Sequence, residues 1–459
     1  MKMTVSEITS ACGGRLLCGD PNTEVTAVST DSRAVPTGAL FVPICGERVD
    51  AHDFIPAVLN GGAAAVLTQE HQTAQGPGAW IAVKNTKNAL QSIAAEYRAR
   101  FSLPVVGITG SVGKTSTKEM VALALSAGKN VMKTNGNNNS QVGVPLTIFR
   151  LSGEYDAAVV EMGMSEFGEM SRIARVAAPD CAVMTNIGVS HIQQLGSRKN
   201  ILAEKLHITD CFHQGSVLFL NGDDEMLREL SGTLPFETVL FGTGADCAFR
   251  AEHVKREGET TRFSYFAPNG ESGEAVIPVI GAHHVLNALA GLAVAQRLGV
   301  PLSAAAGALA QYQAPAMRQQ IHHTQNGITV IDDSYNSSPD AAKSSLGVLT
   351  SFRKGKRIAV LADMLELGSY SAEAHFDVGA FAAHSGVDLL ITVGERAGAM
   401  AEGARSVRPD MDCRVCSDNR QTCETLNSLL ESGDTVLIKG SRSMHTEEIV
   451  SCVLRSKEG

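Results

Sequence analysis

The chain has 459 residues, of which 44% are hydrophobic and 19% are charged, a composition typical of globular proteins. This length is about three times that of an ordinary domain, so we expect three domains. The net charge of -9 and the lack of a dense basic tract exclude a nucleic-acid-binding surface. No apolar stretch approaches the ~18 residues that a membrane span needs, and no signal peptide is visible. We therefore expect a cytoplasmic protein without a membrane span.

Short strands separated by turns dominate the N-terminal part of the sequence. The strands are expected at 24–28, 40–43, 64–67 and 81–83, with turns rich in Gly and Asp between them. A helix over 88–100 then leads into Pro104. We predict that residues 1–82 form a small α/β domain.

From Val105 the pattern changes to buried strands that are each followed by a helix. Strands are predicted at 105–109, 157–160, 181–185 and 216–220, and a helix at 114–126. Such alternation implies a mostly parallel sheet with helices on both faces. Residues 247–280 instead alternate polar and apolar side chains and predict antiparallel hairpins added to the sheet, before an Ala-rich helix at 284–298. These elements define a predicted central domain, residues 83–313.

The C-terminal part of the sequence repeats the α/β pattern. Strands are expected at 328–331, 357–361, 389–393 and 435–438, with helical patterns between them. The prediction for residues 314–459 is an open, Rossmann-like α/β domain. The fold class is therefore α/β, in three domains.

Ten cysteines are scattered along the chain, and two of them have C-x-x-C spacing, Cys413 and Cys416. A metal or redox site of this type needs a second ligand pair or a βα context, and neither is present. We interpret all ten as reduced structural cysteines.

The strongest motif is a glycine-rich loop, Gly107-Ile-Thr-Gly-Ser-Val-Gly-Lys-Thr-Ser116, placed between a strand and a helix. Its backbone N–H groups and the helix N-terminus suit phosphate oxygens. Lys114 can contact the β- and γ-phosphates, and the Thr115 hydroxyl can bind Mg²⁺. Ile108 stands where the common form of this loop has its first Gly. The predicted ATP-binding residues here are Thr109, Gly110, Ser111, Gly113, Lys114, Thr115 and Ser116.

A phosphate loop alone fits a GTPase, a kinase, a motor or a ligase. Five stretches in the expected order resemble the Mur ligase family: 109–116, 134–145, 161–165, 185–191 with Gly196-Ser197 and Lys205 behind it, and 281–287. The resemblance covers essentially the whole chain. It implies an N-terminal domain that binds a UDP-linked substrate, a central ATPase domain and a C-terminal ligase domain, with ATP and two Mg²⁺ ions as cofactors.

The resemblance also implies catalytic and metal-binding roles for single residues. Glu161 directly follows a predicted strand, where a carboxylate can bind Mg²⁺ beside Thr115 and the nucleotide. His191 is expected to bind a second metal ion. The resemblance implies that Lys205 is carbamylated by CO₂ and that the new carboxylate holds Mg²⁺. Without the resemblance, Lys205 would be interpreted as an exposed helix lysine and His191 as a structural residue.

Three further groups of residues carry expected binding roles. Asn287, Arg318, Asp333 and Asn336 are expected to contact the nucleotide, with Asn287 at the adenine. Ser32, Arg33, Gly46, Asn137 and Asn139 are expected at the UDP substrate, where the Arg33 guanidinium suits a diphosphate. Lys439, Ser441 and Arg442 are expected at the terminal carboxylate of a dipeptide. The chain departs from the family pattern at Ser140, His284 and Ala362.

The stretch 331–336, Ile-Asp-Asp-Ser-Tyr-Asn, resembles the family member that adds D-alanyl-D-alanine to a UDP-N-acetylmuramoyl tripeptide. The expected reaction forms an acyl phosphate from ATP and the tripeptide carboxylate, which the amine of the dipeptide then attacks. The resemblance implies a monomer that acts in the synthesis of peptidoglycan precursors.

Three alternatives remain. A folylpolyglutamate synthase shares the phosphate loop but would lack the N-terminal domain and the 332–336 signature. A GTP-binding switch protein would need a guanine-reading N-K-x-D stretch. A catalytically inactive nucleotide-binding module need not retain Lys114, Glu161 and Lys205.

Overall fold

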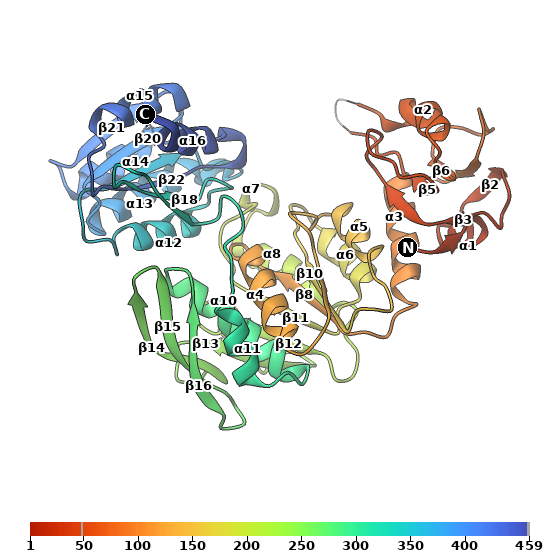
Figure 1. Ribbon diagram of the computed structural model, residues 1–459, viewed down its shortest axis with the longest axis horizontal. Helices are drawn as coiled ribbons and strands as arrows, with labels where there is room; N and C mark the ends of the chain where they lie inside the picture. Colours follow the sequence, from red (N-terminus) through yellow and green to blue (C-terminus); the bar gives the residue numbers. More distant parts are fainter. Residues whose placement is uncertain (47–48, 457–459) are drawn as a thin grey trace.

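The computed structural model describes residues 1–46 and 49–456. Three bodies follow one another in chain order, with the N-terminal one in red and the C-terminal one in blue (Figure 1). Each is built around its own main sheet of five, nine or six strands. None of the helices in the described part of the chain combines the length and the apolar character needed to cross a membrane.

The N-terminal sheet has the order β2-β7-β6-β5-β4, in which only β2 is antiparallel to its neighbour. Helix α2 (Ile55–Asn60) covers it, and Trp80 and Phe41 fill the core between them. The predicted strands are present within a few residues, with the one expected at 24–28 divided into β3 and β4, whereas β1 and β2 were not predicted. The strands are β1 (Met3–Thr4), β2 (Arg15–Cys18), β3 (Glu24–Val25), β4 (Ala27–Ser29), β5 (Ala39–Phe41), β6 (Ala65–Thr68) and β7 (Ala79–Ala82).

The central sheet has the order β16-β15-β14-β13-β12-β11-β8-β10-β9. Its strands from β8 to β14 are parallel, and β14, β15 and β16 form the predicted antiparallel addition. The strands are β8 (Val105–Thr109), β9 (Val131–Lys133), β10 (Ala157–Glu161), β11 (Cys181–Met184), β12 (Val217–Asn221), β13 (Glu237–Gly242), β14 (Phe249–Glu257), β15 (Thr260–Phe266) and β16 (Ser272–Ile277).

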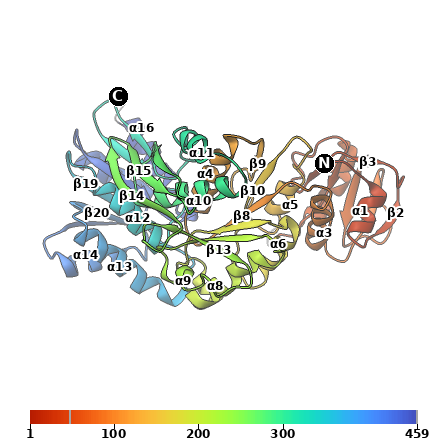
Figure 2. The same ribbon diagram turned by 90° about the horizontal axis from the view of Figure 1, so that it is seen from below.

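Helices cover both faces of this sheet (Figure 2). Successive strand residues point to opposite faces, so Val106 packs with α4, α10 and α11, while Val105 packs with α3 and α6. Helix α3 begins and ends two residues earlier than predicted, since 88–100 was expected, and it contacts both α1 (Val5–Ala11) and the central α5 and α6. The helices are α3 (Thr86–Arg98), α4 (Lys114–Ser126), α5 (Gly143–Ile148), α6 (Glu169–Ala177), α8 (Arg198–Leu206), α10 (Ala282–Arg297) and α11 (Leu302–Leu309).

The C-terminal sheet has the order β17-β18-β22-β19-β20-β21, and only β17 is antiparallel. Helices α12, α13 and α14 cover one face, and α15 and α16 cover the other. The strands are β17 (Gln320–His323), β18 (Thr329–Asp332), β19 (Arg357–Ala362), β20 (Leu389–Val393), β21 (Asp412–Cys416) and β22 (Thr435–Lys439); the helices are α12 (Pro339–Leu349), α13 (Ser371–His384), α14 (Gly398–Val407), α15 (Asn419–Leu429) and α16 (Glu447–Ser456).

The C-x-x-C pair lies on the edge strand β21. Because residues three apart on a strand face opposite sides, Cys413 packs into the core beneath α14 and Cys416 into the core beneath α15. The two thiols therefore do not form a shared site, as expected.

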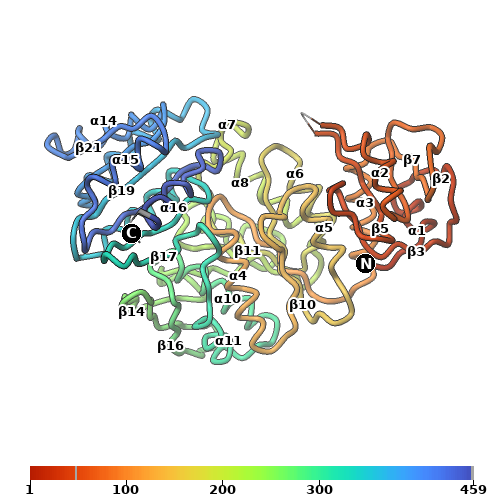
Figure 3. The backbone as a smooth tube through the Cα atoms, turned by 45° about the horizontal axis from the view of Figure 1, so that its top comes forward, coloured from red at the N-terminus to blue at the C-terminus, as the bar shows by residue number. Residues whose placement is uncertain are grey.

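The central and C-terminal bodies touch each other at α7 (Ile192–Leu195) and the 3₁₀ helix η3 (Gly368–Tyr370) (Figure 3). A second contact joins Gly188 and Asp340: a Cβ added at Gly188 would lie 2.1 Å from Asp340 Oδ2. These contacts bring the carboxyl ends of the central strands to face the C-terminal body.

Candidate active site

A cavity of about 410 Å³ lies between the central and C-terminal bodies. Its walls come from the phosphate loop, from the ends of β10 and β11, from α10 and from the segment after β18. The structure therefore brings together residues that are more than 300 positions apart in the sequence. The predicted site residues that line it are Ser111, Gly113, Lys114, Thr115, Ser116, Asn137, Asn139, Glu161, His191, Asn287, Arg318, Asp333, Asn336 and Lys439.

The phosphate loop connects β8 to α4 and needs its glycines for steric reasons. Gly113 is the N-cap of α4 with φ +86°, and Gly110 has φ +146°. A Cβ at Gly110 would lie 1.9 Å from Thr185 Oγ1 at the end of β11. The loop is further held by Ser111 N–H, which donates to the Asn186 carbonyl at 3.0 Å. The neighbouring strand end thus fixes the loop in its phosphate-binding form.

We expect Gly110→Ala to destabilise the protein and to abolish nucleotide binding. The added methyl group clashes with Thr185 while the residue keeps a left-handed φ, which together should cost about 2 to 5 kcal/mol in the free energy of unfolding. Urea unfolding measures this change. Gly153→Ala is the matched control, because a Cβ there meets no atom within 4 Å. Equal stability of the two variants would contradict the steric account of the loop.

Lys114 is the first residue of α4 and is partly buried. Its Nζ donates to the carbonyls of Gly110 at 2.8 Å and Ser111 at 3.3 Å. Burial lowers the pKa of Lys114, and the nearby Glu161 carboxylate partly opposes this shift. The ammonium group folds back on its own loop, within the cradle that phosphates would fill.

Glu161, the last residue of β10, lies at the floor of the cavity with only 1% of its surface exposed. Its Oε1 accepts from Thr115 Oγ1 at 3.2 Å and from Asn139 Nδ2 at 2.8 Å. Its Oε2 has no hydrogen-bond partner among the described residues and lies 3.9 Å from Lys118 Nζ. A buried carboxylate oxygen without a partner, beside a threonine hydroxyl, fits a hard divalent cation such as Mg²⁺.

Lys205 is 1% exposed, so its interpretation as an exposed helix lysine is wrong. The preceding Glu204 carboxylate accepts the N–H groups of Gly168 and Met170 at 2.9 Å each, which ties α8 to α6. Lys205 Nζ then reaches under the phosphate loop and donates to the Gly110 carbonyl at 3.1 Å. Burial, followed by the Lys114 charge, lowers the pKa of Lys205 well below the usual lysine range. A neutral amine is thereby favoured at this position.

His191 has a left-handed backbone, φ +62°, as the N-cap of α7. Its Nδ1 lies 2.8 Å from Glu366 Oε2 of the C-terminal body. The His191 ring lowers the pKa of Glu366. The predicted metal ligand therefore also takes part in a contact between two bodies, which the sequence did not predict.

Two α10 residues form the wall predicted for adenine. Asn287 Oδ1 accepts from Thr117 Oγ1 at 2.9 Å, which leaves its amide hydrogens to face the cavity. Both ring nitrogens of His284 lack a hydrogen-bond partner among the described residues. Burial, and then the adjacent His283, lowers the pKa of His284 well below the usual histidine range. His283 and Gln319 also line the cavity and were missed, since nothing in their local sequence distinguishes them.

The C-terminal contribution differs from the expected one at Lys439. Its Nζ donates to Asp333 Oδ2 at 2.6 Å and to the Asn336 carbonyl at 2.9 Å, so two of its three N–H donors are already used, and its role at the dipeptide carboxylate stays a prediction. Ser345 Oγ, from α12, donates to the same Asp333 oxygen at 2.5 Å and was not predicted. The Arg318 guanidinium lies 4.0 Å from the ring centre of Tyr335.

Several predicted residues lie outside the cavity lining. Thr109 ends β8, Gly110 lies in the loop itself and Lys205 lies beneath it, whereas Ser441 and Arg442 follow β22. Ser441 Oγ accepts the Leu365 N–H at 2.9 Å, and Arg442 Nη1 donates to Glu447 Oε1 at 2.8 Å.

The residues expected at the UDP substrate divide into two groups. Asn137 and Asn139 line the cavity, while Ser32, Arg33 and Gly46 lie in the N-terminal body. Arg33 donates from Nε and Nη2 to Asp31 at 2.8 Å, and this contact lowers the pKa of Asp31 to about 2. One edge of the exposed guanidinium is therefore already used, and its role at a diphosphate stays a prediction. Glu47 and Arg48, in the same stretch as Gly46, lie outside the described residues.

Three family models match the chain: the Mur ligase family catalytic domain at residues 24–98, the Mur ligase middle domain at 108–295 and the Mur ligase glutamate ligase domain at 317–442. The UDP-N-acetylmuramoyl-tripeptide--D-alanyl-D-alanine ligase of Bacillus subtilis is 35% identical, over 99% of both chains. The protein of the same name from Escherichia coli is 32% identical, over 98% of both chains.

Solved structures give a matching result. MurF from Acinetobacter baumannii superposes with a TM-score of 0.92 at 28% identity, over 99% of both chains. MurF from Thermotoga maritima in complex with ADP has a TM-score of 0.84 at 27% identity, over 95% of this chain and 98% of that one. A folylpolyglutamate synthase from Mycobacterium tuberculosis is 17% identical and shares the fold alone. With three matching domain models and full-length relatives, the chain belongs to the Mur ligase family.

Proposed function

We propose that this protein is an ATP-dependent, ADP-forming ligase that joins D-alanyl-D-alanine to a UDP-N-acetylmuramoyl tripeptide in peptidoglycan precursor synthesis. The observation that carries the proposal is the cavity between two bodies, in which a phosphate loop and the buried Glu161 carboxylate, whose Oε2 accepts no hydrogen bond from the described residues, face the Asp333–Asn336 segment. Full-length relatives that bear this activity in their names support the choice of substrates. We further propose that it acts as a monomer in the cytoplasm, with domains at 1–82, 83–313 and 314–459.

The chain's own residues supply positioning and charge. The N–H groups at the start of α4 face the triphosphate, and Lys114 turns from its loop carbonyls to the β- and γ-phosphates. The attacking carboxylate of the tripeptide then displaces ADP from the γ-phosphate, and the dipeptide amine displaces phosphate from the acyl phosphate. Because the cavity lies between two bodies, closure would keep water from the acyl phosphate.

Thr115 and Glu161 would hold one Mg²⁺ ion. Glu161 Oε2 is the oxygen with room for it, since Thr115 and Asn139 already use Oε1. When bound, the ion would neutralise charge on the phosphate oxygens. His191 would hold a second ion together with a carbamate on Lys205. The burial of Lys205 and its single carbonyl partner suit an amine that must be neutral to react with CO₂.

Phosphate release tests the proposal most simply. ATP turnover should require both the UDP-muramoyl tripeptide and the dipeptide, and should be negligible with either alone. A folylpolyglutamate-type ligase would instead use a pteroyl substrate and glutamate. Turnover with that pair, or GTP hydrolysis without an acceptor, would reject the proposed function.

Arg442→Ala should raise the KM for the dipeptide several-fold more than the KM for ATP. Arg442 is half exposed and its guanidinium is anchored by Glu447, so it can still present donors to a terminal carboxylate. Steady-state kinetics with each substrate varied in turn measures the two constants. Arg420→Ala, an exposed arginine on α15, is the matched control. An unchanged dipeptide KM in Arg442→Ala would remove Arg442 from the proposed dipeptide site.

A further inference from the structure

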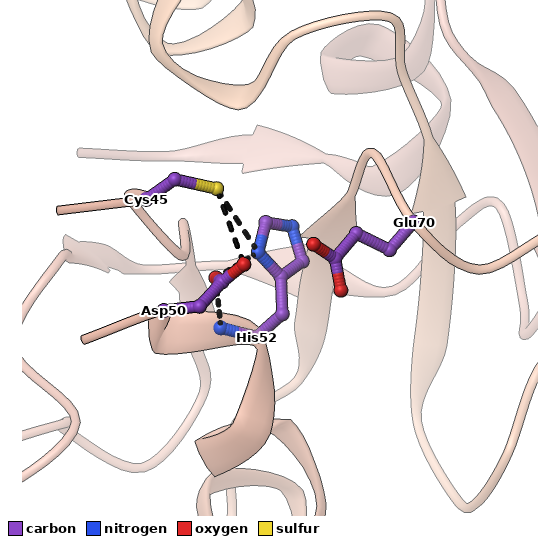
Figure 4. Close-up of side chains that lie close together, drawn as sticks. All are labelled: Cys45, Asp50, His52 and Glu70. Atoms are coloured by element: carbon purple, nitrogen blue, oxygen red, sulfur yellow. Dashed lines mark hydrogen bonds and ion pairs between the residues drawn. The ribbon is translucent and has the colours of Figure 1, made fainter. Parts of the chain in front are cut away.

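A second cluster of metal-binding side chains lies in the N-terminal body, apart from the active-site cavity. Cys45, Asp50, His52 and Glu70 each offer one ligand atom, and these atoms all lie within 4.8 Å of one another. Figure 4 shows the four side chains converging from the segment after β5 and from the turn after β6. The proposed ligase reaction uses none of them.

The backbone holds three of these residues in place. Cys45 and Asp50 form an antiparallel bridge, which holds these two residues beside each other. Asp50 Oδ1 accepts the His52 N–H at 2.9 Å as the N-cap of the 3₁₀ helix η1 (Ala51–Phe54). The His52 ring is 2% exposed, and the Gln69 N–H donates to its Nε2 at 3.3 Å. The histidine is therefore anchored at the base of the cluster.

The remaining ring nitrogen, His52 Nδ1, points at the other donors. It lies 2.6 Å from Asp50 Oδ1 and 3.7 Å from Cys45 Sγ. Cys45 Sγ also lies 3.4 Å from Asp50 Oδ2. Cys45 and Glu70 are exposed, so an ion could enter from solvent. In a tetrahedral zinc site with bonds of ~2.0–2.3 Å, ligand atoms lie roughly 3.3–3.8 Å apart, so small side-chain movements would suffice.

The donor set selects the class of ion. One thiolate, one imidazole and two carboxylates suit Zn²⁺ or Co²⁺, whereas Mg²⁺ and Ca²⁺ prefer oxygen ligands alone. Binding would also change the hydrogen bonds of His52. Its proton would move from Nδ1 to Nε2, so the bonds to Asp50 and from Gln69 would both be lost. Only an ion that binds nitrogen and sulfur ligands strongly would offset the free energy of these two lost hydrogen bonds.

We propose that Cys45, Asp50, His52 and Glu70 bind one Zn²⁺-class ion, with Cys45 as a thiolate whose proton passes to solvent. The ion joins the segment after β5 to the turn after β6, beyond the carboxyl ends of these two neighbouring parallel strands. Gly46, which is expected at the UDP substrate, directly follows Cys45, so the site is tested by metal binding without ATP, tripeptide or dipeptide.

Cobalt binding to the full-length protein tests the site. After dialysis against a chelator and then chelator-free buffer, Co²⁺ should bind as one equivalent with a thiolate-to-cobalt absorption band in the near ultraviolet, and Zn²⁺ should displace it. Cys45→Ser should lose the band, and Glu70→Gln should weaken Co²⁺ binding at least about tenfold. Both side chains are exposed, so the variants should fold, which circular dichroism checks.

Cys18→Ser is the matched control, because Cys18 lies in the same body and its Sγ donates only to the Gly78 carbonyl at 3.4 Å. It should keep the band and the affinity of the unaltered protein. A Cys45→Ser protein with the same band and affinity would overturn the proposal. So would the absence of a thiolate band at any Co²⁺ concentration up to about 1 mM, roughly the weak end of functional protein–ligand affinities.

Discussion

Lys114→Ala protein is expected to fold normally and to release phosphate at less than a hundredth of the unaltered rate. Removal of one charge directed at a reacting phosphate removes roughly 3 kcal/mol or more of transition-state stabilisation. The fold should survive, because Lys114 Nζ donates only to two carbonyls of its own loop. Phosphate release with all three substrates, together with a thermal melt, measures both effects.

The control for this variant is Lys84→Ala, which removes an exposed lysine before α3. It should leave turnover and melting unchanged. If Lys114→Ala retained more than about a tenth of the activity, the loop would not be contacting the reacting phosphate. If the Lys114→Ala protein failed to melt cooperatively, its loss of activity would result from a loss of folded structure. The prediction that this substitution leaves the fold intact would then be wrong.

Lys205 gives the second large effect. Lys205→Ala should lose nearly all turnover, and a short carboxylic acid such as formate or acetate should restore part of it by occupying the vacated space. The reason is that a carbamate on Lys205 would supply a carboxylate group. A free carboxylate from the added acid can take the place of that group. Lys205→Met fills the space without an amine, so it should be inactive and should not be rescued. Titration of turnover with formate measures the rescue.

Lys199→Ala, an exposed lysine on the same helix α8, should keep full activity. Full activity in Lys205→Ala would exclude any role for the amine. An intact-mass measurement cannot decide the question, since carbamates are lost on acidification, whereas high-resolution density with nucleotide and both metals bound can. Unmodified lysine density in that state would reject the carbamate.

The nucleotide side of the active site was predictable because its signals are local. The phosphate loop is one continuous stretch between a strand and a helix, and Glu161 directly follows the apolar run of β10. The ends of parallel strands meet at one sheet edge, so residues from β8, β10 and β11 were expected to converge. The cavity contains these residues.

The contacts that the sequence did not reveal all join distant segments of the chain. Lys205 looks like an exposed residue on a polar helix, and only the bonds of Glu204 to α6 turn it under the loop. The Lys439–Asp333 pair joins residues that are 106 positions apart. Neither the charge of Lys439 nor its place at the end of a strand indicated that Asp333 would be its partner. His191 likewise meets Glu366 only where two bodies touch.

Secondary structure was predictable where strands are buried on both faces. The missed strands β17 and β21 carry exposed polar residues, so their sequences lack a continuous apolar run, whereas β9 and β13 were missed although they contain Val131-Met132 and Val239-Leu240-Phe241. Strands β17 and β21 lie at sheet edges, where one side of the backbone has no strand partner. The neighbouring strand decides how these segments pair, and the periodicity of a single segment carries no information about its neighbour.

The most direct test of the central claim is the mass of the product formed from ATP, UDP-N-acetylmuramoyl tripeptide and either D-alanyl-D-alanine or D-alanine alone. We predict a product heavier than the tripeptide substrate by one dipeptide less one water, with one ADP and one phosphate formed for each product. The single amino acid should give little or no product, because its carboxylate falls about 3.5 Å short of the groups that bind the dipeptide terminus. Coupling of D-alanine as readily as the dipeptide, or ADP formation without a coupled product, would contradict this account.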